Sequence, residues 1–156
     1  MCSPDAATGA EEESGGVIVS NTDLVVTGNG SLEIAANRAD GILGKNDLWI
    51  DGGAFTITAA DDAITAERNL VISAGIIDIV ESVEGIEAPI IVINGGTIKI
   101  NSSDDGINAS DSDLVADGLS ITFNGGDITV NGEVVTELAN QFAGENCGPR
   151  TVFALN

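Results

Sequence analysis

Residues 101–109 read NSSDDGINA, and the centre of this stretch, an acid followed by a small residue and an isoleucine, occurs four times along the chain. The four copies are ADGI at 39–42, DDAI at 61–64, VEGI at 83–86 and DDGI at 104–107. Their isoleucines are spaced by 22, 22 and 21 residues. A period of this kind is typical of solenoids, in which each repeat packs only on its neighbours.

Each period also carries two short segments in which apolar and other residues alternate. The first segments are Leu24–Val26, Leu48–Ile50, Leu70–Ile72, Ile91–Ile93 and Leu114–Ala116. After a turn rich in Gly, Asn and Asp, the second segments are Leu32–Ile34, Phe55–Ile57, Ile77–Ile79, Ile98–Ile100 and Ile121–Phe123. Alternation with a period of two between such turns predicts strands. We therefore expect an all-β fold, a right-handed parallel β-helix of about five coils with capped ends.

The sequence near both ends departs from the repeat and suggests three segments. We expect a flexible tether over residues 1–16, the β-helix over 17–135 and a C-terminal cap or interface tail over 136–156. Within the last part of the β-helix, Asn131-Gly132 predicts a hairpin turn between residues 125 and 135. The alternation in residues 151–155 predicts one more strand in the tail.

The charge balance restricts the partners of the chain. The 156 residues include 25 acidic and 5 basic residues and no His, for a formal net charge of −20. Such a chain has little with which to neutralise a phosphate backbone, so we expect no nucleic acid among its partners. The lack of His removes the commonest transition-metal ligand and general base, whereas hard, oxygen-seeking cations such as Ca²⁺ remain.

The acids of the four repeats should lie above one another in a solenoid. Asp40, Asp62, Glu84 and Asp105 then form one column, with Asp61 and Asp104 beside it. Carboxylates about 5 Å apart repel unless a cation lies between them, and Ca²⁺ takes six to eight oxygen ligands. Asn108 and Asn46 could add amide oxygens, and further acids follow at Asp47, Glu67, Glu87, Asp111 and Asp113. The alternative is that these are solvated turn acids without an ion.

Several stretches carry a resemblance to a known family, namely DDAITAERNLVI, DDGINASDSDLV, INGGTIKI and FNGGDITVNGEVVTELANQF. Together they resemble bacterial surface proteins described as carbohydrate-binding domain-containing, whose described member is a clostridial cellulose-binding β-helix. The resemblance covers residues 20 to 142. It implies a pectate-lyase-like shape, bound Ca²⁺, an extracellular or cell-surface location, and binding of cellulose or polygalacturonate. It places calcium ligation on Asp61, Asp62, Asp104 and Asp105, with Asp40 and Glu84 as weaker versions.

Two outward faces suggest two ways of binding. The second segments present a polar column that includes Thr56, Asp78 and Lys99, followed by Thr122, on which a polysaccharide could lie. Trp49, the sole Trp, projects outward from a first segment and could stack on a sugar ring or be covered by a cap or a partner chain.

The first segments present an outward apolar column of Val25, Trp49, Val71, Val92 and Val115, and such a stripe normally marks an interface. The tail over 136–156, which includes Val152 and Phe153, could cover this column within the chain. Between chains, the same tail or the strand at Val17–Val19 could add to the open edge of a neighbouring copy, or whole solenoids could stack end to end. Either arrangement would build a homo-oligomer or filament.

Catalysis is not expected. Lyase chemistry of the pectate type would need a basic residue beside the metal, and the five basic residues are scattered over an acidic chain.

Cys2, in MCSP, is the expected lipid-bearing residue of a lipoprotein from which the signal has been replaced by a start Met, and this lipid would be the only membrane contact. A disulfide between Cys2 and Cys147, or two free thiols, are the alternatives. The sequence thus predicts an extracellular calcium-binding β-helix that binds polysaccharide without cleaving it, or else a calcium-dependent self-assembling protein.

Overall fold

A computed structural model describes residues 15–111, 118–138 and 153–155, and in these ranges it contains strands and no helix. The strands are β1 (Gly16–Ser20), β2 (Leu24–Ala36), β3 (Asp40–Gly44), β4 (Leu48–Ala59), β5 (Ile64–Ala66), β6 (Asn69–Ser82), β7 (Ile86–Glu87), β8 (Ile90–Ile93), β9 (Thr97–Asp111), β10 (Ser120–Phe123), β11 (Asp127–Leu138) and β12 (Phe153–Leu155). Within this part of the chain, no helix is long and apolar enough to cross a membrane.

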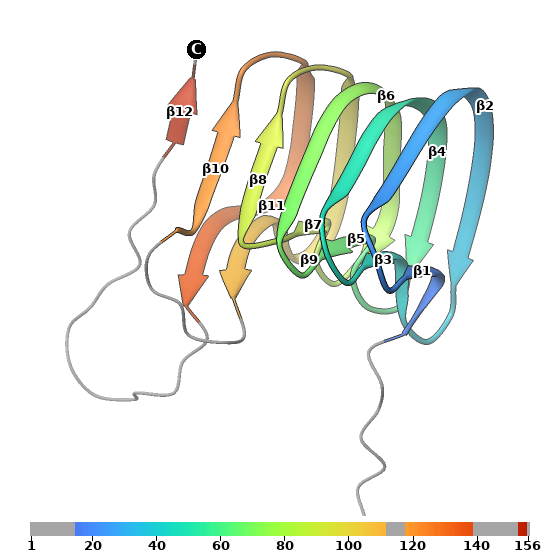
Figure 1. The fold of residues 1–156 in the computed structure, drawn as a ribbon. Coiled ribbons are helices and arrows are strands. Elements are labelled where there is room, and N and C mark those ends of the chain that lie inside the picture. Colours follow the sequence, from blue (N-terminus) through green and yellow to red (C-terminus); the bar gives the residue numbers. More distant parts are fainter. Residues whose placement is uncertain (1–14, 112–117, 139–152, 156) are drawn as a thin grey trace, which may run out of the picture.

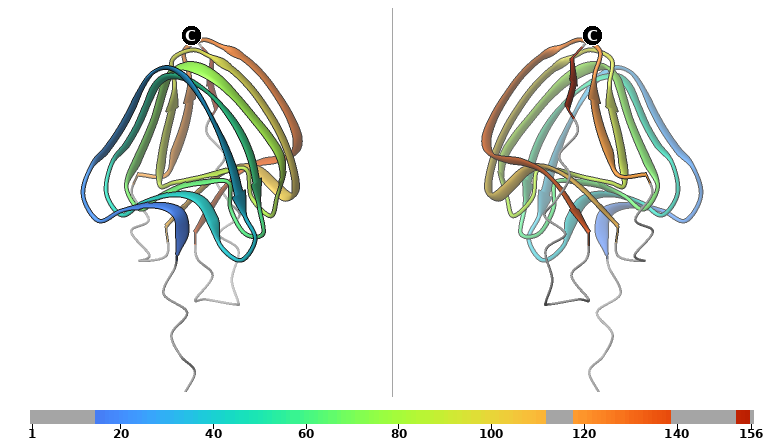
Figure 2. Two further views of the ribbon diagram at one scale, coloured as in Figure 1. Left: turned by 90° about the vertical axis from the view of Figure 1, so that its right-hand side faces the viewer. Right: turned by 90° about the vertical axis from the view of Figure 1, so that its left-hand side faces the viewer.

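The strands wind into a solenoid of about five coils with a roughly triangular cross-section (Figures 1 and 2). The first face holds the starts of β2, β4 and β6 together with β8, β10 and β12. The second face holds the later parts of β2, β4 and β6 and the starts of β9 and β11. The third face holds β1, β3, β5, β7 and the ends of β9 and β11. Every pair is parallel, as the sequence predicts.

The long strands turn from the first face to the second through stacked glycines. Gly52 and Gly75 have φ angles of 115° and 117°, a region that residues with a side chain rarely adopt. The close approach between coils adds a second reason, because a Cβ atom at Gly75 would lie 3.0 Å from the carbonyl oxygen of Gly53. The glycines in the turns therefore allow the coils to stack at this corner.

Columns of aliphatic side chains fill the interior. Ile42, Ile64, Ile86 and Ile107 stack on the third face and are all fully buried. Leu48, Leu70, Ile91 and Ile121 form the matching column of the first face, and Ile57, Ile79 and Ile100 that of the second. Burying each such side chain contributes roughly 1.5–3 kcal/mol, so these columns supply the core of the fold.

The fifth coil differs from the sequence-based expectation. The sequence predicts Ile121–Phe123 as a strand of the second face, but this segment belongs to β10, which pairs with β8 and places Ile121 beside Ile91 on the first face. The matching strand of the second face is β11, in which Ile128 pairs with Ile98. The expected first strand at 114–116 lies outside the described residues. The prediction failed because the last coil is longer than the others, with 30 residues between the paired Asn94 and Asn124.

The hairpin predicted around Asn131-Gly132 is also wrong. Strand β11 runs parallel to β9 throughout, and its pairing with β9 shifts between Asn131 and Val134. Gly132, with φ of 137°, lies within this irregular part, where the strand passes from the second face to the third. The strand continues to Leu138. A strand predicted in the tail is present as β12, which pairs with β10 and extends the first face instead of lying across it.

Candidate functional site

The acids of the repeat lie in one column on the third face. The backbone N–H of Gly41 donates to the carbonyl of Asp62 at 2.9 Å, and the N–H of Gly85 donates to that of Asp105 at 2.9 Å. The same register joins the second coil to the third and extends to the fifth, where Asp105 pairs with Glu133. We use "acid column" for Asp40, Asp62, Glu84, Asp105 and Glu133.

A small residue follows each of the first four acids because the corner leaves no room for more. A Cβ atom added at Gly41 would lie 2.5 Å from the carbonyl oxygen of Ala63 and 2.8 Å from Cγ2 of Ile57. The following isoleucine is then fully buried, as Ile42 and Ile64 are. The local sequence of acid, small residue and isoleucine thus combines a sharp corner, an internal anchor and a carboxylate in a fixed register.

The carboxylates contact the next coil. The backbone N–H of Asp62 donates to Oδ1 of Asp40 at 3.3 Å, and the N–H of Glu84 donates to Oδ1 of Asp62 at 3.2 Å. Each of these carboxylates therefore lies beside the backbone of the acid that follows it in the column. Carboxyl groups therefore accumulate along this part of the third face.

A second column lies beside the acid column, three residues further along each strand. It contains Thr65, Glu87 and Asn108, which pair in that order. The side-chain amide of Asn108 donates to Oε2 of Glu84 at 3.1 Å, and Ser110 donates to Oε1 of Glu87. The hydroxyl oxygen of Thr65 and Oδ1 of Asn108 are buried and have no hydrogen-bond partner. The face thus brings carboxylates together with unpartnered oxygen atoms.

Two groups of carboxylates are close enough to share an ion. Oxygen atoms of Asp40, Asp61 and Asp62 lie within 4.8 Å of one another, and so do those of Asp62, Glu84 and Glu87. Asp62 belongs to both groups. The carboxyl oxygens, with the amide and hydroxyl oxygens beside them, match the ligands preferred by hard cations such as Ca²⁺.

Burial and mutual repulsion raise the pKa values of these acids. Burial is the main cause for Asp62, whose pKa rises to about 9, and contact with Glu87 raises it further. Burial and the charge of Glu87 raise the pKa of Glu84 to about 8, although the amide of Asn108 acts in the opposite direction. Burial raises the pKa of Asp40 to about 6. Among the described residues, no Lys or Arg forms an ion pair with these three acids.

The predicted metal ligands divide into two sets. Asp40, Asp61, Asp62 and Glu84 lie in the two carboxylate groups, and Asn108 contacts the second of them through Glu84. Asp104 and Asp105 join neither group. For Asp104 the reason lies in the register, because Val83 of the third coil lies between Asp104 and Asp61. The N–H of Val83 donates to the carbonyl of Asp61, and the N–H of Asp104 donates to that of Val83.

Three residues of this face, Glu87, Thr65 and Glu133, have places that the sequence does not predict. Glu87 was expected only as an additional acid near the edge, yet it lies in the second carboxylate group. Thr65 and Glu133 were not expected in the site. Thr65 could have been found from its place immediately after the repeat isoleucine, which is also the place of Glu87 and Asn108. Glu133 could not be found from the period, because the last coil is longer than the others.

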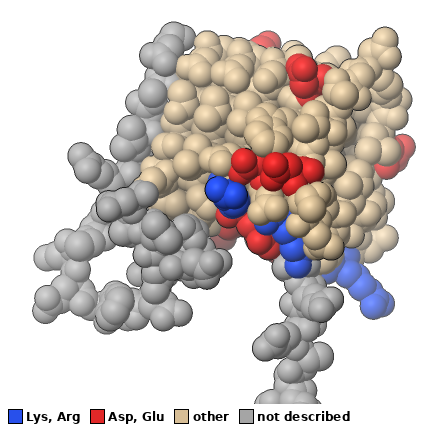
Figure 3. Space-filling view, in the orientation of Figure 1, with Lys and Arg blue, Asp and Glu red and all other residues tan. Residues whose placement is uncertain are grey.

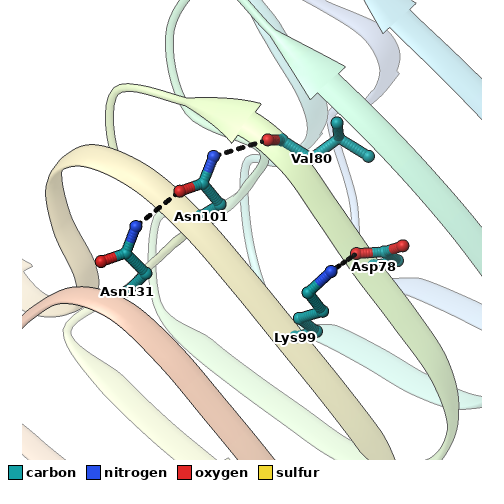
Figure 4. A network of polar contacts seen from close by, with 5 residues as sticks. All are labelled: Asp78, Val80, Lys99, Asn101 and Asn131. Atoms are coloured by element: carbon teal, nitrogen blue, oxygen red, sulfur yellow. Dashed lines mark hydrogen bonds and ion pairs between the residues drawn. The ribbon is translucent and has the colours of Figure 1, made fainter.

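The predicted ligand-binding residues occupy two different faces. Thr56, Asp78 and Lys99 pair in register on the second face, where Nζ of Lys99 lies 3.8 Å from Oδ1 of Asp78 (Figure 4). The next residue in this column is Thr129, not Thr122, because Thr122 is on the first face. Trp49 is half-buried on the first face between Val25 and Val71. Trp49 is therefore not part of the polar column.

The apolar column of the first face is present over four coils. Val25 pairs with Trp49, Trp49 with Val71 and Val71 with Val92, but Val92 then pairs with Thr122. Val115 and Val152 lie outside the described residues, and Phe153 pairs with Ile121 through β12. Figure 3 shows this face as largely free of charged side chains, with acidic and basic groups gathered below it.

Comparisons with known proteins give two matches. The family model of carbohydrate-binding domain-containing proteins matches residues 3–141. A solved structure described as a gadolinium derivative of the polysaccharide lyase-like protein from C. thermocellum is 28% identical, with a TM-score of 0.61. The similarity covers 86% of this chain and 57% of that chain, so this chain spans little more than half of its relative. No curated protein matches the chain.

Proposed function

We propose, from the premise that the chain belongs to the family of carbohydrate-binding domain-containing proteins, that it binds a polysaccharide without cleaving it and that Ca²⁺ on the acid column stabilises its solenoid. The polysaccharide classes to test are those expected from the sequence, cellulose and polygalacturonate. We place the protein outside the cell, where millimolar Ca²⁺ is available, with Cys2 as the lipid-bearing residue of an anchored form.

The observation that carries the calcium proposal is the group of Asp62, Glu84 and Glu87. Three carboxylates share a volume in which their oxygens lie within 4.8 Å of one another, and no described Lys or Arg pairs with Asp62 or Glu84. Without a cation, such a group holds protons at neutral pH, which is the physical meaning of the pKa values raised to about 9 and about 8. A divalent cation would replace those protons and satisfy the neighbouring oxygen atoms.

The ligands that this chain would offer are specific. Asp62, Glu84 and Glu87 would hold the ion in one group, while Asp40 and Asp61 with Asp62 would hold it in the other. The unpartnered oxygens of Thr65 and Asn108 lie on the same face and can complete the coordination. The ion would supply charge compensation between coils. The similar solved structure is a gadolinium derivative, and gadolinium, like calcium, is a hard cation that oxygen ligands bind.

Support for polysaccharide binding comes from family membership and from the second face. Its strands present Thr56, Asp78 and Lys99 in register on exposed or half-buried positions, which suits hydrogen bonding to sugar hydroxyls. We propose binding without cleavage because Lys99, the basic residue of this column, pairs with Asp78 and has 68% of its side chain exposed. A catalytic base would need to be held in a defined position.

Calcium binding can be tested by comparing thermal unfolding in millimolar Ca²⁺ and in chelator. An ion at 100 times its Kd stabilises a folded chain by about 2.7 kcal/mol, so we expect a clear rise in Tm. Asp62→Asn should remove most of this rise, because Asp62 belongs to both carboxylate groups. Asp127→Asn, on an exposed residue of the second face, is the matched control. Equal Tm values for the wild-type chain in calcium and in chelator would exclude this part of the proposal.

Polysaccharide binding and cleavage are separated by two measurements on the same samples. Pull-down with insoluble cellulose and gel retardation in polygalacturonate should retain the full chain in calcium. The release of reducing ends or unsaturated products should stay at the level of a blank. Product formation by the wild-type chain would show an enzyme, and a lack of retention on every polysaccharide tried would remove the binding proposal.

A second candidate function is calcium-dependent self-assembly, and the open edge of the first coil favours it. Val17, Val19 and Val25 are 55%, 43% and 59% exposed on strands that pair on one side only within the described residues. A second copy could continue the solenoid at this edge. Negative-stain electron microscopy should show fibres or stacks in calcium and not in chelator. Deletion of residues 149–156 should abolish them if the tail provides the strand. Monodisperse particles under both conditions would contradict self-assembly.

A further inference from the structure

A notch lies at the corner between the second and third faces, beside the two carboxylate groups but lined by none of their residues. It has a volume of about 400 Å³ and is lined by residues of three successive coils, namely Ala59, Ala60, Glu81, Ser82, Val83, Asn101, Ser102 and Ser103. Most of these side chains are small, so they leave the corner unfilled. The volume lies within the roughly 300–1,000 Å³ typical of small-molecule sites. We use "corner notch" for this feature.

A β-bulge in β6 shapes the corner notch. Ile57 pairs with Ile79, but the next pair is Thr58 with Glu81, so β6 has one more residue here than β4. The pairing with β9 shows the same surplus, since Ile79 pairs with Ile100 and Ser82 pairs with Ser102. Bulges bend a strand and redirect its side chains, and they are common next to binding sites. Here the bulge leaves Glu81 exposed in the lining.

Asparagine side chains hold the bulge in place. Nδ2 of Asn101 donates to the carbonyl oxygen of Val80 at 2.9 Å, and Nδ2 of Asn131 donates to Oδ1 of Asn101 at 2.7 Å (Figure 4). These contacts use one hydrogen atom and one lone pair of the Asn101 amide, so the amide has one donor and one acceptor left. The exposed Asn101 can therefore receive a ligand while it supports the corner.

The rest of the lining combines hydrogen-bonding groups with apolar surfaces, as a site for a sugar ring requires. Ser102 donates to the carbonyl of Asn131 at 3.2 Å and Ser103 to that of Ser82 at 3.2 Å, so both hydroxyl oxygens can still accept hydrogen bonds. The hydroxyl of Ser82 is buried without a partner. Ala60 and Val83 are exposed apolar walls. Sugar rings combine hydroxyl groups with apolar C–H faces and can use both kinds of wall.

Charge decides which class of sugar the notch accepts. Its lining holds one ionisable side chain, Glu81, and neither Lys nor Arg. Asp61 and Asp104 directly follow the lining residues Ala60 and Ser103 in the chain, and both are exposed. A uronic acid would place its carboxylate among these acids, at a cost in Coulomb energy. A neutral sugar has no such cost, and its hydroxyls can donate to Glu81.

We propose that the corner notch is a subsite for one ring of a neutral polysaccharide and that it discriminates against uronic acids. The inference rests on the proposed polysaccharide binding and narrows it to a place and a class of sugar. The column of Thr56, Asp78 and Lys99 lies on the same strands, β4, β6 and β9, so a chain that enters the notch can continue along the second face.

The test is titration calorimetry of the full chain with cellohexaose and with hexagalacturonate, each in calcium and in chelator. We expect the wild-type chain to bind cellohexaose in both conditions and more tightly than hexagalacturonate in chelator. Ala60→Trp, which fills the notch from an exposed position, should weaken cellohexaose binding by about tenfold or more. Val25→Trp likewise introduces a tryptophan at an exposed position, but on the first face, and should leave binding unchanged. Ser103→Trp blocks the other side of the notch and serves if Ala60→Trp does not fold.

The possible results distinguish failure of the subsite proposal from failure of the proposed polysaccharide binding. Cellohexaose binding that survives both folded notch variants would overturn the subsite while leaving polysaccharide binding intact. Tighter binding of hexagalacturonate in chelator would overturn the assigned class of sugar. If the wild-type chain binds neither oligosaccharide nor the polymers, the proposed function fails and the subsite fails with it.

Discussion

The side-chain amide of Asn108 donates a hydrogen bond to the carboxylate of Glu84 on the preceding coil, with 3.1 Å between Nδ2 and Oε2. The other end of the same amide, Oδ1, is buried without a partner. Turned by 180°, the amide would present Oδ1 to a cation shared with Glu84, and no backbone movement would be needed. Asn108 thus suits both the metal-free and the metal-bound form of the third face.

This relationship predicts opposite effects of Asn108→Asp on stability and on calcium affinity. The new carboxylate would lie beside Glu84 in a position that is 4% exposed, so the metal-free chain should unfold at a lower temperature than the wild type. In calcium it would add a charged ligand and should lower the Kd by about tenfold. Thermal unfolding in chelator and calcium titration calorimetry measure the two effects.

The control for this variant is Asn124→Asp, on an exposed residue that bonds to Asn94 in another turn. It changes the net charge by the same amount and should leave calcium affinity unchanged. If Asn108→Asp weakens calcium binding, Asn108 does not face the ion.

The internal columns predict a large cost for Ile64→Ala. Ile64 is fully buried between Ile42 and Ile86, and the loss of three methyl or methylene groups should lower the free energy of unfolding by about 2–5 kcal/mol. Val25→Ala, at a side chain that is 59% exposed, should change it by less than about 0.5 kcal/mol. Urea denaturation checks both values. Similar costs for the two variants would contradict the division into interior and outer faces.

The sharp corner predicts that Gly41→Ala destabilises the chain. The added Cβ atom would lie 2.5 Å from the carbonyl oxygen of Ala63, so neighbouring coils must shift, at about 1–3 kcal/mol. Gly30→Ala is the matched control, because nothing lies within 4 Å of its added Cβ atom. Denaturant unfolding should separate the two alanine variants. Equal stabilities would mean that the corner is not tightly packed.

Much of the fold could be predicted because the repeat carries its own register. The spacing of Ile42, Ile64, Ile86 and Ile107 places equivalent residues above one another, and every residue near them in a coil inherits that placement. The acid column follows from the same spacing. In the last coil the spacing changes, so the period no longer predicts which residues lie above one another. The period puts Thr122 on the second face, whereas the residue that pairs with Lys99 there is Thr129.

The details of the site depend on side-chain contacts between coils, which the spacing of the sequence repeat does not predict. The sequence favoured the two DD corners, yet the third coil lies between them and places Val83 beside Asp61 and Asp104. The group of Asp62, Glu84 and Glu87 depends on how side chains three residues apart meet across coils. The corner notch depends on one extra residue in β6 relative to β4 and β9. The alternation of apolar residues in the sequence gives no sign of this extra residue.

The raised pKa values predict that the metal-free chain loses stability as the pH rises. Asp62, Glu84 and Asp40 have folded-state pKa values of about 9, about 8 and about 6, above ordinary values of 3.8, 4.5 and 3.8. The folded chain therefore holds protons that the unfolded chain releases. Their contribution to stability is complete below about pH 4 and is lost as the pH rises toward about 9.

Calcium should reverse this dependence, because the ion takes the place of the protons. We expect Tm in chelator to fall between about pH 5 and about pH 9, while calcium affinity rises over the same range. Asp62→Asn removes a titrating group and should flatten the fall in chelator, whereas Asp127→Asn, on an exposed residue of the second face, should not. A Tm in chelator that rises across this range would show that Asp62 and Glu84 are ionised and compensated without calcium, and the acid column would then need no cation.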